Sequence, residues 1–255
     1  MVTTTPRPIA LLKRIMALEL TQRSGGRSGD NVHLPADFLA AVEETYGGTR
    51  LGRQELDGEL IEDFEGALWR REMMEECRMD GNRQANRRVV VGVDPPAGVD
   101  GDECGIVVCG LGGDGTGYVL ADLSEGGLSP EGWARKVAAA AEARGAHRVV
   151  AEANNGGKMV ETVLRGASVN LPVRLVHASE GKSARAEPVA ALFEAGRVKL
   201  AGVFPKLEDQ LCGMLIGGGY VGPGRSPDRA DAMVWALSEL MLGKSGAEPR
   251  VRGFF

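Results

Sequence analysis

Five apolar, strand-like runs follow one another from residue 88 onward, and helical patterns separate the later ones. Strands are predicted over 88–94, 104–111, 117–123, 147–152 and 172–178, and helices over 130–144, 158–166, 183–195, 205–214 and 228–242. The turn sequence at 112–116, Gly-Gly-Asp-Gly-Thr, is a strong hairpin signal and makes the first three strands an antiparallel meander. Strands that then alternate with helices indicate a mixed sheet flanked by helices, so we expect an α/β fold.

The first third of the chain has a different character. Helices are predicted between Pro8 and about residue 20, over 35–46 and over 66–79, with a Gly- and Ser-rich connector at 21–34. The polar segment at 80–87 marks a boundary. The chain is therefore predicted to consist of a mostly helical N-terminal extension (1–87), one α/β domain (88–242) and a C-terminal tail (243–255).

The composition excludes several classes of protein. Of the 255 residues, 43% are hydrophobic and 25% are charged, as in an ordinary globular protein. No apolar run reaches the roughly 18 residues of a membrane span, and the N-terminus lacks the layout of a signal peptide. The four cysteines form no CxxC pair, which argues against a disulfide framework or a zinc site and fits a reducing cytoplasm.

The formal net charge of −5 is not that of a protein that holds nucleic acid by bulk positive charge. Contact with DNA would then depend on a local basic stripe. The candidates for this stripe are Lys182, Arg185, Arg197, Lys199 and Lys206. Because an acidic cleft that binds cations itself contributes negative charge, the net charge does not exclude a nuclease.

Three carboxylates stand at the ends of predicted elements. Asp94 ends the first strand, Glu152 ends the fourth, and Asp231 opens the apolar part of the last helix. In a mixed sheet the first and fourth strands can be neighbours, and a helix across the sheet can add the third carboxylate. Such groups cost desolvation free energy unless something offsets it. Two divalent cations would do so, and they would suit the hydrolysis of a phosphodiester.

The same element order, with one carboxylate on the first strand, one on the fourth and one on the last helix, resembles the ribonuclease H-like fold. The segments VDPP, VVAEANNGGKMVETVLR, HASEGKSARAEPVAALFEAGRV, FPKLEDQLC and SPDRADAMVWAL resemble the nuclease domain of the large terminase subunit of tailed phages, prophages and gene-transfer agents. The resemblance covers residues 88–241 nearly continuously. It implies a ribonuclease H-like mixed β-sheet flanked by helices, with the N-terminal extension beside it.

The resemblance also implies roles for the acidic residues. Asp94 is expected to bridge two Mg²⁺ or Mn²⁺ ions, and Glu152 and Asp231 are each expected to hold one. Asp228 lies three residues before Asp231 on the same face of the helix start, and we expect it to be an auxiliary acid or a cap.

Four further residues are candidates for DNA contact. Lys182 and Arg185 follow a small-residue loop after a strand end, which places them near the carboxylates in this topology; they would neutralise phosphate charge there, or be plain solvated charges. Asn155 and Lys158 stand at a helix start, where a DNA phosphate could bind, although loop structure alone also explains the neighbouring glycines.

Other chemistry-bearing side chains are predicted to be structural. His147 and His177 lie at strand ends without partners and are expected to be core-edge residues. Trp133 and Trp235 are expected to be core residues.

The N-terminal third fits the same family. TTTPRP and GTRLGRQELDGELIED resemble the end of a terminase ATPase domain and the passage into the nuclease. The phosphate loop GxxxxGK[ST] occurs nowhere in this sequence, so ATPase activity is not expected from this chain. The motor would be a separate chain or a part of a longer one.

The leading hypothesis is a metal-dependent DNA endonuclease that cuts concatemeric phage-like DNA during genome packaging. Its expected partners are double-stranded DNA, the terminase ATPase domain, the small terminase and the portal. No membrane partner is expected. The expected location is the cytoplasm of a bacterial host cell. The alternatives are a Holliday-junction resolvase-like nuclease and a non-catalytic docking module of the packaging motor. A sugar-kinase-like ATPase is disfavoured because glycine-rich phosphate loops are missing after the first strand.

Overall fold

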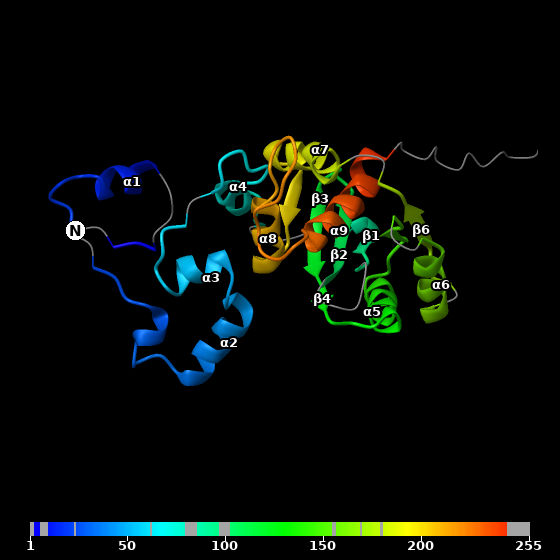
Figure 1. Ribbon diagram of the computed structural model, residues 1–255, viewed down its shortest axis with the longest axis horizontal. Helices are drawn as coiled ribbons and strands as arrows, with labels where there is room; N and C mark the ends of the chain where they lie inside the picture. Colours follow the sequence, from blue (N-terminus) through cyan, green and yellow to red (C-terminus); the bar gives the residue numbers. More distant parts are fainter. Residues whose placement is uncertain are drawn as a thin grey trace, which may run out of the picture.

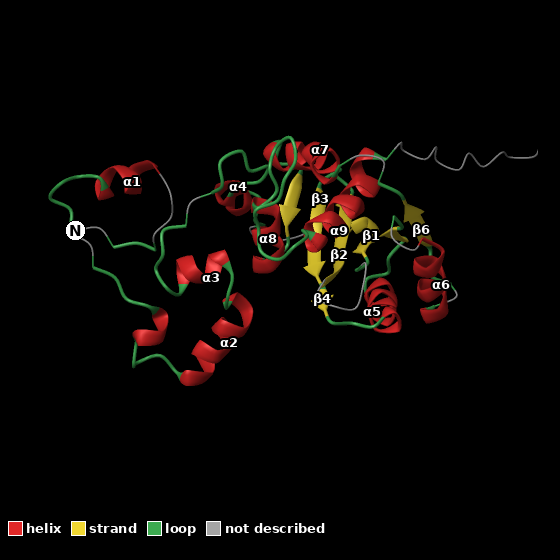
Figure 2. Cartoon of the chain, viewed as in Figure 1, coloured by secondary structure: helices red, strands yellow, loops and turns green. Residues whose placement is uncertain are grey.

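A computed structural model of the 255-residue chain describes residues 3–5, 10–22, 24–61, 63–79, 86–96, 103–154, 157–168, 170–178 and 181–243. A β-sheet lies at the centre of the larger part of the molecule, with helices on both of its faces (Figures 1 and 2). Most of the first 60 residues extend away from this part, at the left of Figure 1.

Within the described residues the sheet has seven strands: β1 (Asn86–Asp94), β2 (Glu103–Gly112), β3 (Gly117–Asp122), β4 (Glu125–Gly126), β5 (Arg148–Glu152), β6 (Val173–Val176) and β7 (Val198–Leu200). The strand order is β6-β5-β1-β2-β3-β7, and β4 pairs with β2. The predicted meander is confirmed, because β1–β2 and β2–β3 are antiparallel. β5, β6 and β7 join in parallel, as a mixed sheet requires.

Alternate side chains of the central strands belong to two separate hydrophobic cores, because neighbouring residues of a strand point to opposite faces of a sheet. One face packs against α5 (Pro130–Ala143) and α6 (Gly157–Ala167) through residues such as Val91. The other packs against α7 (Lys182–Glu194), α8 (Pro205–Cys212) and α9 (Asp228–Leu237) through residues such as Val90. The predicted fold class, a ribonuclease H-like mixed sheet flanked by helices, is confirmed.

Local sequence signals explain where several elements begin and end. Ser129 caps α5, and its Oγ accepts a hydrogen bond from the backbone N–H of Gly132 at 3.1 Å. Pro130 supplies the first helical residue, and the chain leaves the helix through Gly145, whose φ is 57°. In the hairpin between β2 and β3, Gly115 adopts a φ of 82°, which an L side chain would disfavour.

Other elements differ from the sequence-based prediction. The short strands β4 and β7 and the helix α3 (Arg50–Glu55) were not predicted. The predicted helix over 66–79 is only α4 (Arg71–Glu76), because the backbone before it pairs with another segment: the N–H of Leu68 donates to the carbonyl of Met214 at 2.8 Å. The predicted helix over 228–242 divides into α9 and a π-helical turn, η2 (Ser238–Leu242).

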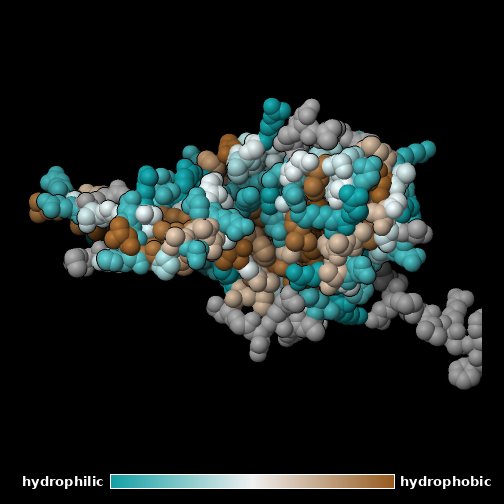
Figure 3. All heavy atoms as spheres, turned by 90° about the horizontal axis from the view of Figure 1, so that it is seen from below, coloured by the Kyte–Doolittle hydropathy of each residue, from teal (hydrophilic) through white to brown (hydrophobic). Residues whose placement is uncertain are grey.

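The N-terminal part contains α1 (Ala10–Met16), the short 3-10 helix η1 (Ser28–Asp30) and α2 (Ala36–Tyr46). Several large apolar side chains are exposed along it, and brown patches mark this narrow part in Figure 3; they are Leu11, Leu18, Leu20, Val32 and Phe38. Within the described residues, no helix is both long enough and apolar enough to span a membrane.

Residues 66–79 are packed into the core on the α9 face of the sheet. Trp69 and Met74 are fully buried in that core. Arg71 donates to the buried carboxylates of Glu208 at 3.0 Å and Asp209 at 2.5 Å, both on α8. This stretch is therefore tied to the sheet by packing and by buried ion pairs, whereas the predicted division of the chain at residues 87 and 243 stays a prediction.

Candidate active site

The carboxylates at the strand ends are neighbours. β1 and β5 run parallel, with Val93 paired to Ala151, so Asp94 and Glu152 follow at the same end of adjacent strands. The even-numbered residues of β1 face α9, as the contact of Gly92 with that helix shows. The proximity of Asp94 and Glu152 that the sequence predicted is thus what the sheet register produces.

Two glycines allow α9 to approach the sheet closely. A Cβ built on Gly92 would lie 1.9 Å from the carbonyl oxygen of Ala232, and one built on Gly105 would lie 2.0 Å from that of Asp228. Gly105 is the partner of Asp94 across the β1–β2 ladder. The first turn of α9 therefore rests directly on the strand position opposite Asp94.

Two polar residues that the sequence analysis missed hold the start of α9 in place. The side-chain oxygen of Gln210, on α8, accepts hydrogen bonds from the backbone N–H groups of Arg229 at 2.8 Å and Ala230 at 3.3 Å. The buried guanidinium of Arg229 pairs with Glu103 at 2.6 Å and Asp122 at 2.6 Å. Both residues lie in segments that carry the family resemblance, FPKLEDQLC and SPDRADAMVWAL, but their partners are distant in sequence, so no local pattern could have revealed these contacts.

Asp231 is the most enclosed of the three carboxylates. Its exposed fraction is 1%, and neither of its oxygens has a hydrogen-bond partner among the described residues. Two cations of α7 lie beside it instead: the Lys182 ammonium forms an ion pair with Oδ2, and the Arg185 guanidinium lies 3.7 Å from Oδ1. Asp228, one turn earlier, is half-buried at the first position of α9, and Pro227 takes the N-cap position.

Arg185 also reaches Glu152, and a tryptophan completes the arrangement. Arg185 Nη1 donates to Glu152 Oε2 at 3.1 Å, and the Trp235 indole Nε1 donates to the same oxygen at 2.8 Å. The Arg185 guanidinium lies 4.4 Å from the centroid of the Trp235 ring. The prediction that Trp235 is only a core residue is incomplete, because its polar edge belongs to this site.

The electrostatics follow from this crowding. Burial raises the pKa of Asp94 well above its ordinary value, and the charge of Asp231 raises it further, while Lys182 opposes the shift. Burial likewise raises the pKa of Asp231, and Lys182 and Arg185 lower it in part. Burial would lower the pKa of Lys182, but the neighbouring carboxylates outweigh it and the pKa is raised. Lys182 and Arg185 therefore do not fully compensate the negative charge of these carboxylates.

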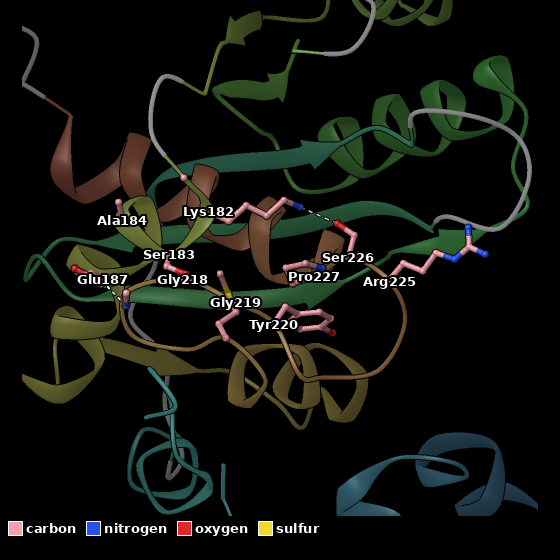
Figure 4. Close-up of a pocket in the computed structure, with 13 residues that line it drawn as sticks. Lys182, Ser183, Ala184, Glu187, Gly218, Gly219, Tyr220, Arg225, Ser226 and Pro227 are labelled. Atoms are coloured by element: carbon pink, nitrogen blue, oxygen red, sulfur yellow. Dashed lines mark hydrogen bonds between the residues drawn. The ribbon is translucent and has the colours of Figure 1, made fainter. Parts of the chain in front are cut away.

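A groove of about 490 Å³ adjoins Lys182. It is formed by the start of α7 and by the glycine-rich loop before α9, and Lys182 Nζ donates to Ser226 Oγ across one end at 2.7 Å (Figure 4). Arg225 lines the groove and points away from Lys182 in this view. Positive side chains thus lie on both sides of Ser226.

The DNA-contact roles of two other residues stay predictions. Lys158 is exposed on α6, and Asn155 lies outside the described residues. Of the predicted basic stripe, Lys182 and Arg185 lie on α7 and Lys199 lies on the edge strand β7; the stripe itself stays a prediction. The expectation that His147 is a core-edge residue without partners is wrong: its side chain is exposed, and its Nδ1 accepts a hydrogen bond from the Val89 N–H at 3.2 Å.

The sequence model of the family described as the terminase RNaseH-like domain matches residues 91–240, which is more than half of the chain. This chain belongs to that family. The matched range of the terminase RNaseH-like domain begins within β1, runs through β2 to α9, and includes Asp94, Glu152 and Asp231. Among curated proteins, none matches the sequence.

Solved structures of phage terminases share this fold at low sequence identity. The large terminase nuclease from thermophilic phage G20c with bound cobalt is 17% identical, with a TM-score of 0.53, over 69% of this chain and 98% of that one. The nuclease domain of the large terminase subunit gp2 of bacterial virus Sf6 is 12% identical, with a TM-score of 0.54, over 67% and 98%. The HK97 bacteriophage large terminase is 13% identical, with a TM-score of 0.51, over 82% of this chain and 51% of that one.

The donor chemistry of this terminase RNaseH-like domain suits a hard divalent cation. Carboxylate oxygens are the ligands that Mg²⁺ prefers, and the only charged partners of the buried Asp231 carboxylate among the described residues are Lys182 and Arg185. Across the same residues, no group of three or more His, Cys, Asp or Glu side chains is assembled as a metal site. Lys182 and Arg185 pair with two of the three carboxylates, so a cation would have to replace them as counter-charges.

Proposed function

We propose that this chain is a metal-dependent DNA endonuclease that cuts concatemeric phage-like DNA during genome packaging. The observation that supports it most is that Asp94 and Glu152 lie at the same end of the adjacent strands β1 and β5, with the buried Asp231 of α9 close enough for its charge to raise the pKa of Asp94. Membership of the terminase RNaseH-like domain family agrees with this chemistry.

The proposed ligands are Asp94, Glu152 and Asp231, which would hold two Mg²⁺ or Mn²⁺ ions. Asp94 is the candidate for the ligand shared by the two ions, because β1 pairs with β5, which carries Glu152, and α9, which carries Asp231, rests on the strand position opposite Asp94. When bound, the cations supply Lewis-acid stabilisation of the reacting phosphate and a lowered pKa of water. The structures of the G20c nuclease with bound cobalt and with bound magnesium support divalent-cation chemistry in this fold.

The protein itself positions the carboxylates and supplies positive charge beside them. The close packing of α9 against Gly92 and Gly105 fixes Asp231 relative to Asp94. Lys182 and Arg185, which lie beside Asp231 and Glu152, would place positive charge near the reacting phosphate. Backbone contacts of this kind position DNA without reading its sequence, so the cut is expected to be weakly sequence-selective.

The proposed partners are double-stranded DNA, a terminase ATPase domain, the small terminase and the portal. This chain spans about half of the HK97 large terminase, and the structure of another large terminase, from a thermophilic bacteriophage, has been determined in complex with ATP-gamma-S. Because the sequence contains no GxxxxGK[ST] loop, cleavage by this chain should not require ATP.

Incubation of purified protein with supercoiled plasmid tests the proposal. Nicked and linear products should form with Mg²⁺ or Mn²⁺, should not form in EDTA, and should not depend on ATP. Robust cleavage in EDTA would contradict the mechanism. Binding to portal or small terminase without cleavage under any metal condition would favour the docking module, and cleavage confined to four-way junctions would favour the resolvase.

A further inference from the structure

Two donors converge on one oxygen of Glu152. The Trp235 Nε1–H and the Arg185 Nη1–H both reach Oε2, at 2.8 Å and 3.1 Å, and no described residue donates a hydrogen bond to Oε1. The carboxylate is half-buried at the end of β5. Its rotation is therefore fixed from one side by groups that come from two different helices.

The same two donors are fixed to each other. The Arg185 guanidinium lies over the Trp235 ring at 4.4 Å from its centroid, a distance at which a cation is attracted to the face of an indole. Arg185 has a side-chain exposure of 10%, so water screens this contact little. The indole N–H thus donates to Glu152, and the indole face holds the Arg185 guanidinium beside Glu152.

Trp235 is also linked to the third carboxylate through the helix. It lies four residues after Asp231 on α9, and residues at this spacing share one face of a helix. Arg185 completes a closed path, since its Nη2 is 3.7 Å from Asp231 Oδ1. One tryptophan therefore connects the carboxylate of β5 with that of α9.

We propose that Trp235 is a positioning residue for the catalytic carboxylates: its N–H presents Glu152 to a divalent cation through the other oxygen, Oε1, and its ring holds Arg185 between Glu152 and Asp231. This inference rests on the proposed function in one respect, namely that Glu152 is a cation ligand. Partners that orient a metal ligand typically contribute roughly 10- to 100-fold to metal affinity or activity.

Trp235→Phe is the informative substitution, because it keeps an aromatic ring under Arg185 and removes only the N–H. The chain offers a matched control at Trp69, whose Nε1 is buried and finds no hydrogen-bond partner within the described part of the chain. Trp69→Phe removes an N–H that makes no hydrogen bond to the described residues, so cation binding should stay unchanged. Thermal unfolding of both variants confirms that they are folded.

Titration calorimetry with Mn²⁺ alone measures the effect without any cleavage assay. Trp235→Phe should weaken Mn²⁺ binding about tenfold, Trp69→Phe should not, and the loss should disappear when Glu152 is already Gln, because the indole then has no carboxylate to orient. In parallel, titration with Mg²⁺ should change the tryptophan fluorescence of the wild type and of Trp69→Phe saturably, but not that of Trp235→Phe.

The outcomes separate this inference from the proposed function. Wild-type affinity in a folded Trp235→Phe variant, or an equal loss in the Glu152→Gln background, would overturn the positioning role while the nuclease proposal stands. A wild-type protein that binds neither Mn²⁺ nor Mg²⁺ would overturn the proposed function itself.

Discussion

Gly92 lies directly against the backbone of Ala232, so closely that a Cβ at position 92 would be 1.9 Å from the Ala232 carbonyl oxygen. A backbone atom cannot move aside as the end of a flexible side chain can. The contact between β1 and α9 therefore sets the distance from which Asp231 approaches Asp94, and it makes the site depend on a residue without a side chain.

Gly92→Ala should push α9 away from the sheet. We expect a loss of roughly 1–3 kcal/mol in the free energy of unfolding, measured by urea denaturation, because overpacking a core strains its neighbours. Plasmid cleavage should fall as well, since Asp231 moves with the helix. Gly113→Ala is the control, because nothing lies within 4 Å of a Cβ there, and it should leave both quantities unchanged. A Gly92→Ala variant as stable and as active as the wild type would refute the tight contact.

Asp94→Asn should abolish cleavage and, in EDTA, should stabilise the fold at neutral pH. The pKa of Asp94 is raised by burial and by Asp231, so the folded state binds this proton more tightly than the unfolded state does. Ionisation of Asp94 thus costs stability once the pH exceeds the ordinary aspartate pKa of about 4, and the cost is complete only above the raised value. The advantage of Asn should therefore be larger at pH 8 than at pH 5 in urea denaturation. Asp114→Asn, at an exposed carboxylate whose pKa is lowered by its hydrogen bond from the Thr116 backbone, should show no such gain.

Arg71→Ala should destabilise the protein strongly. It leaves the buried carboxylates of Glu208 and Asp209 without one cation, and breaking a buried pair in this way costs roughly 3–5 kcal/mol. Arg165→Ala, which breaks an exposed pair with Glu161, should cost at most about 0.5 kcal/mol. Urea denaturation compares the two. Equal, small losses would mean that residues before 88 contribute little to the stability of the sheet domain.

Lys182→Ala and Arg185→Ala should lower cleavage on all DNA sequences alike. Both side chains are expected to contact phosphate rather than bases, so the cut-site distribution should stay the same while the rate falls. DNA binding should weaken with rising salt, and each variant should have a shallower salt dependence than the wild type. Lys158→Ala, at an exposed position on α6, tests the separate prediction that Lys158 contacts a DNA phosphate. A change in cut-site preference would show that one of these cations reads the sequence.

The sequence was most informative where one element carries its own signal. The Gly-Gly-Asp-Gly-Thr turn, the Ser129 cap and the apolar runs of β1 and β5 were each sufficient to predict the strand or helix that the structure contains. From the order of these elements followed the neighbourhood of Asp94 and Glu152.

What the sequence could not supply depends on contacts between distant residues. β7 has only three residues, and its pairing with β3 provides what its own pattern does not. Residues 66–70 look helical in sequence, but hydrogen bonds with the backbone of residues 214–216 hold them in a non-helical conformation. Gln210 and Arg229 act on α9 through tertiary hydrogen bonds, and Trp235 shows its polar role only once Glu152 and Arg185 lie beside it.

We propose that Asp94, Glu152 and Asp231 form a single catalytic site. The most direct test is the rate of Mn²⁺-dependent plasmid cleavage by Asp94→Asn, Asp231→Asn and the double variant, with Asp228→Asn alongside. Groups that act as a unit are non-additive, so each single substitution should abolish cleavage to about the same residual level as the double variant. Asp228→Asn should retain more activity than Asp231→Asn. Wild-type rates for either Asp94→Asn or Asp231→Asn, or multiplicative losses in the double variant, would contradict a shared site.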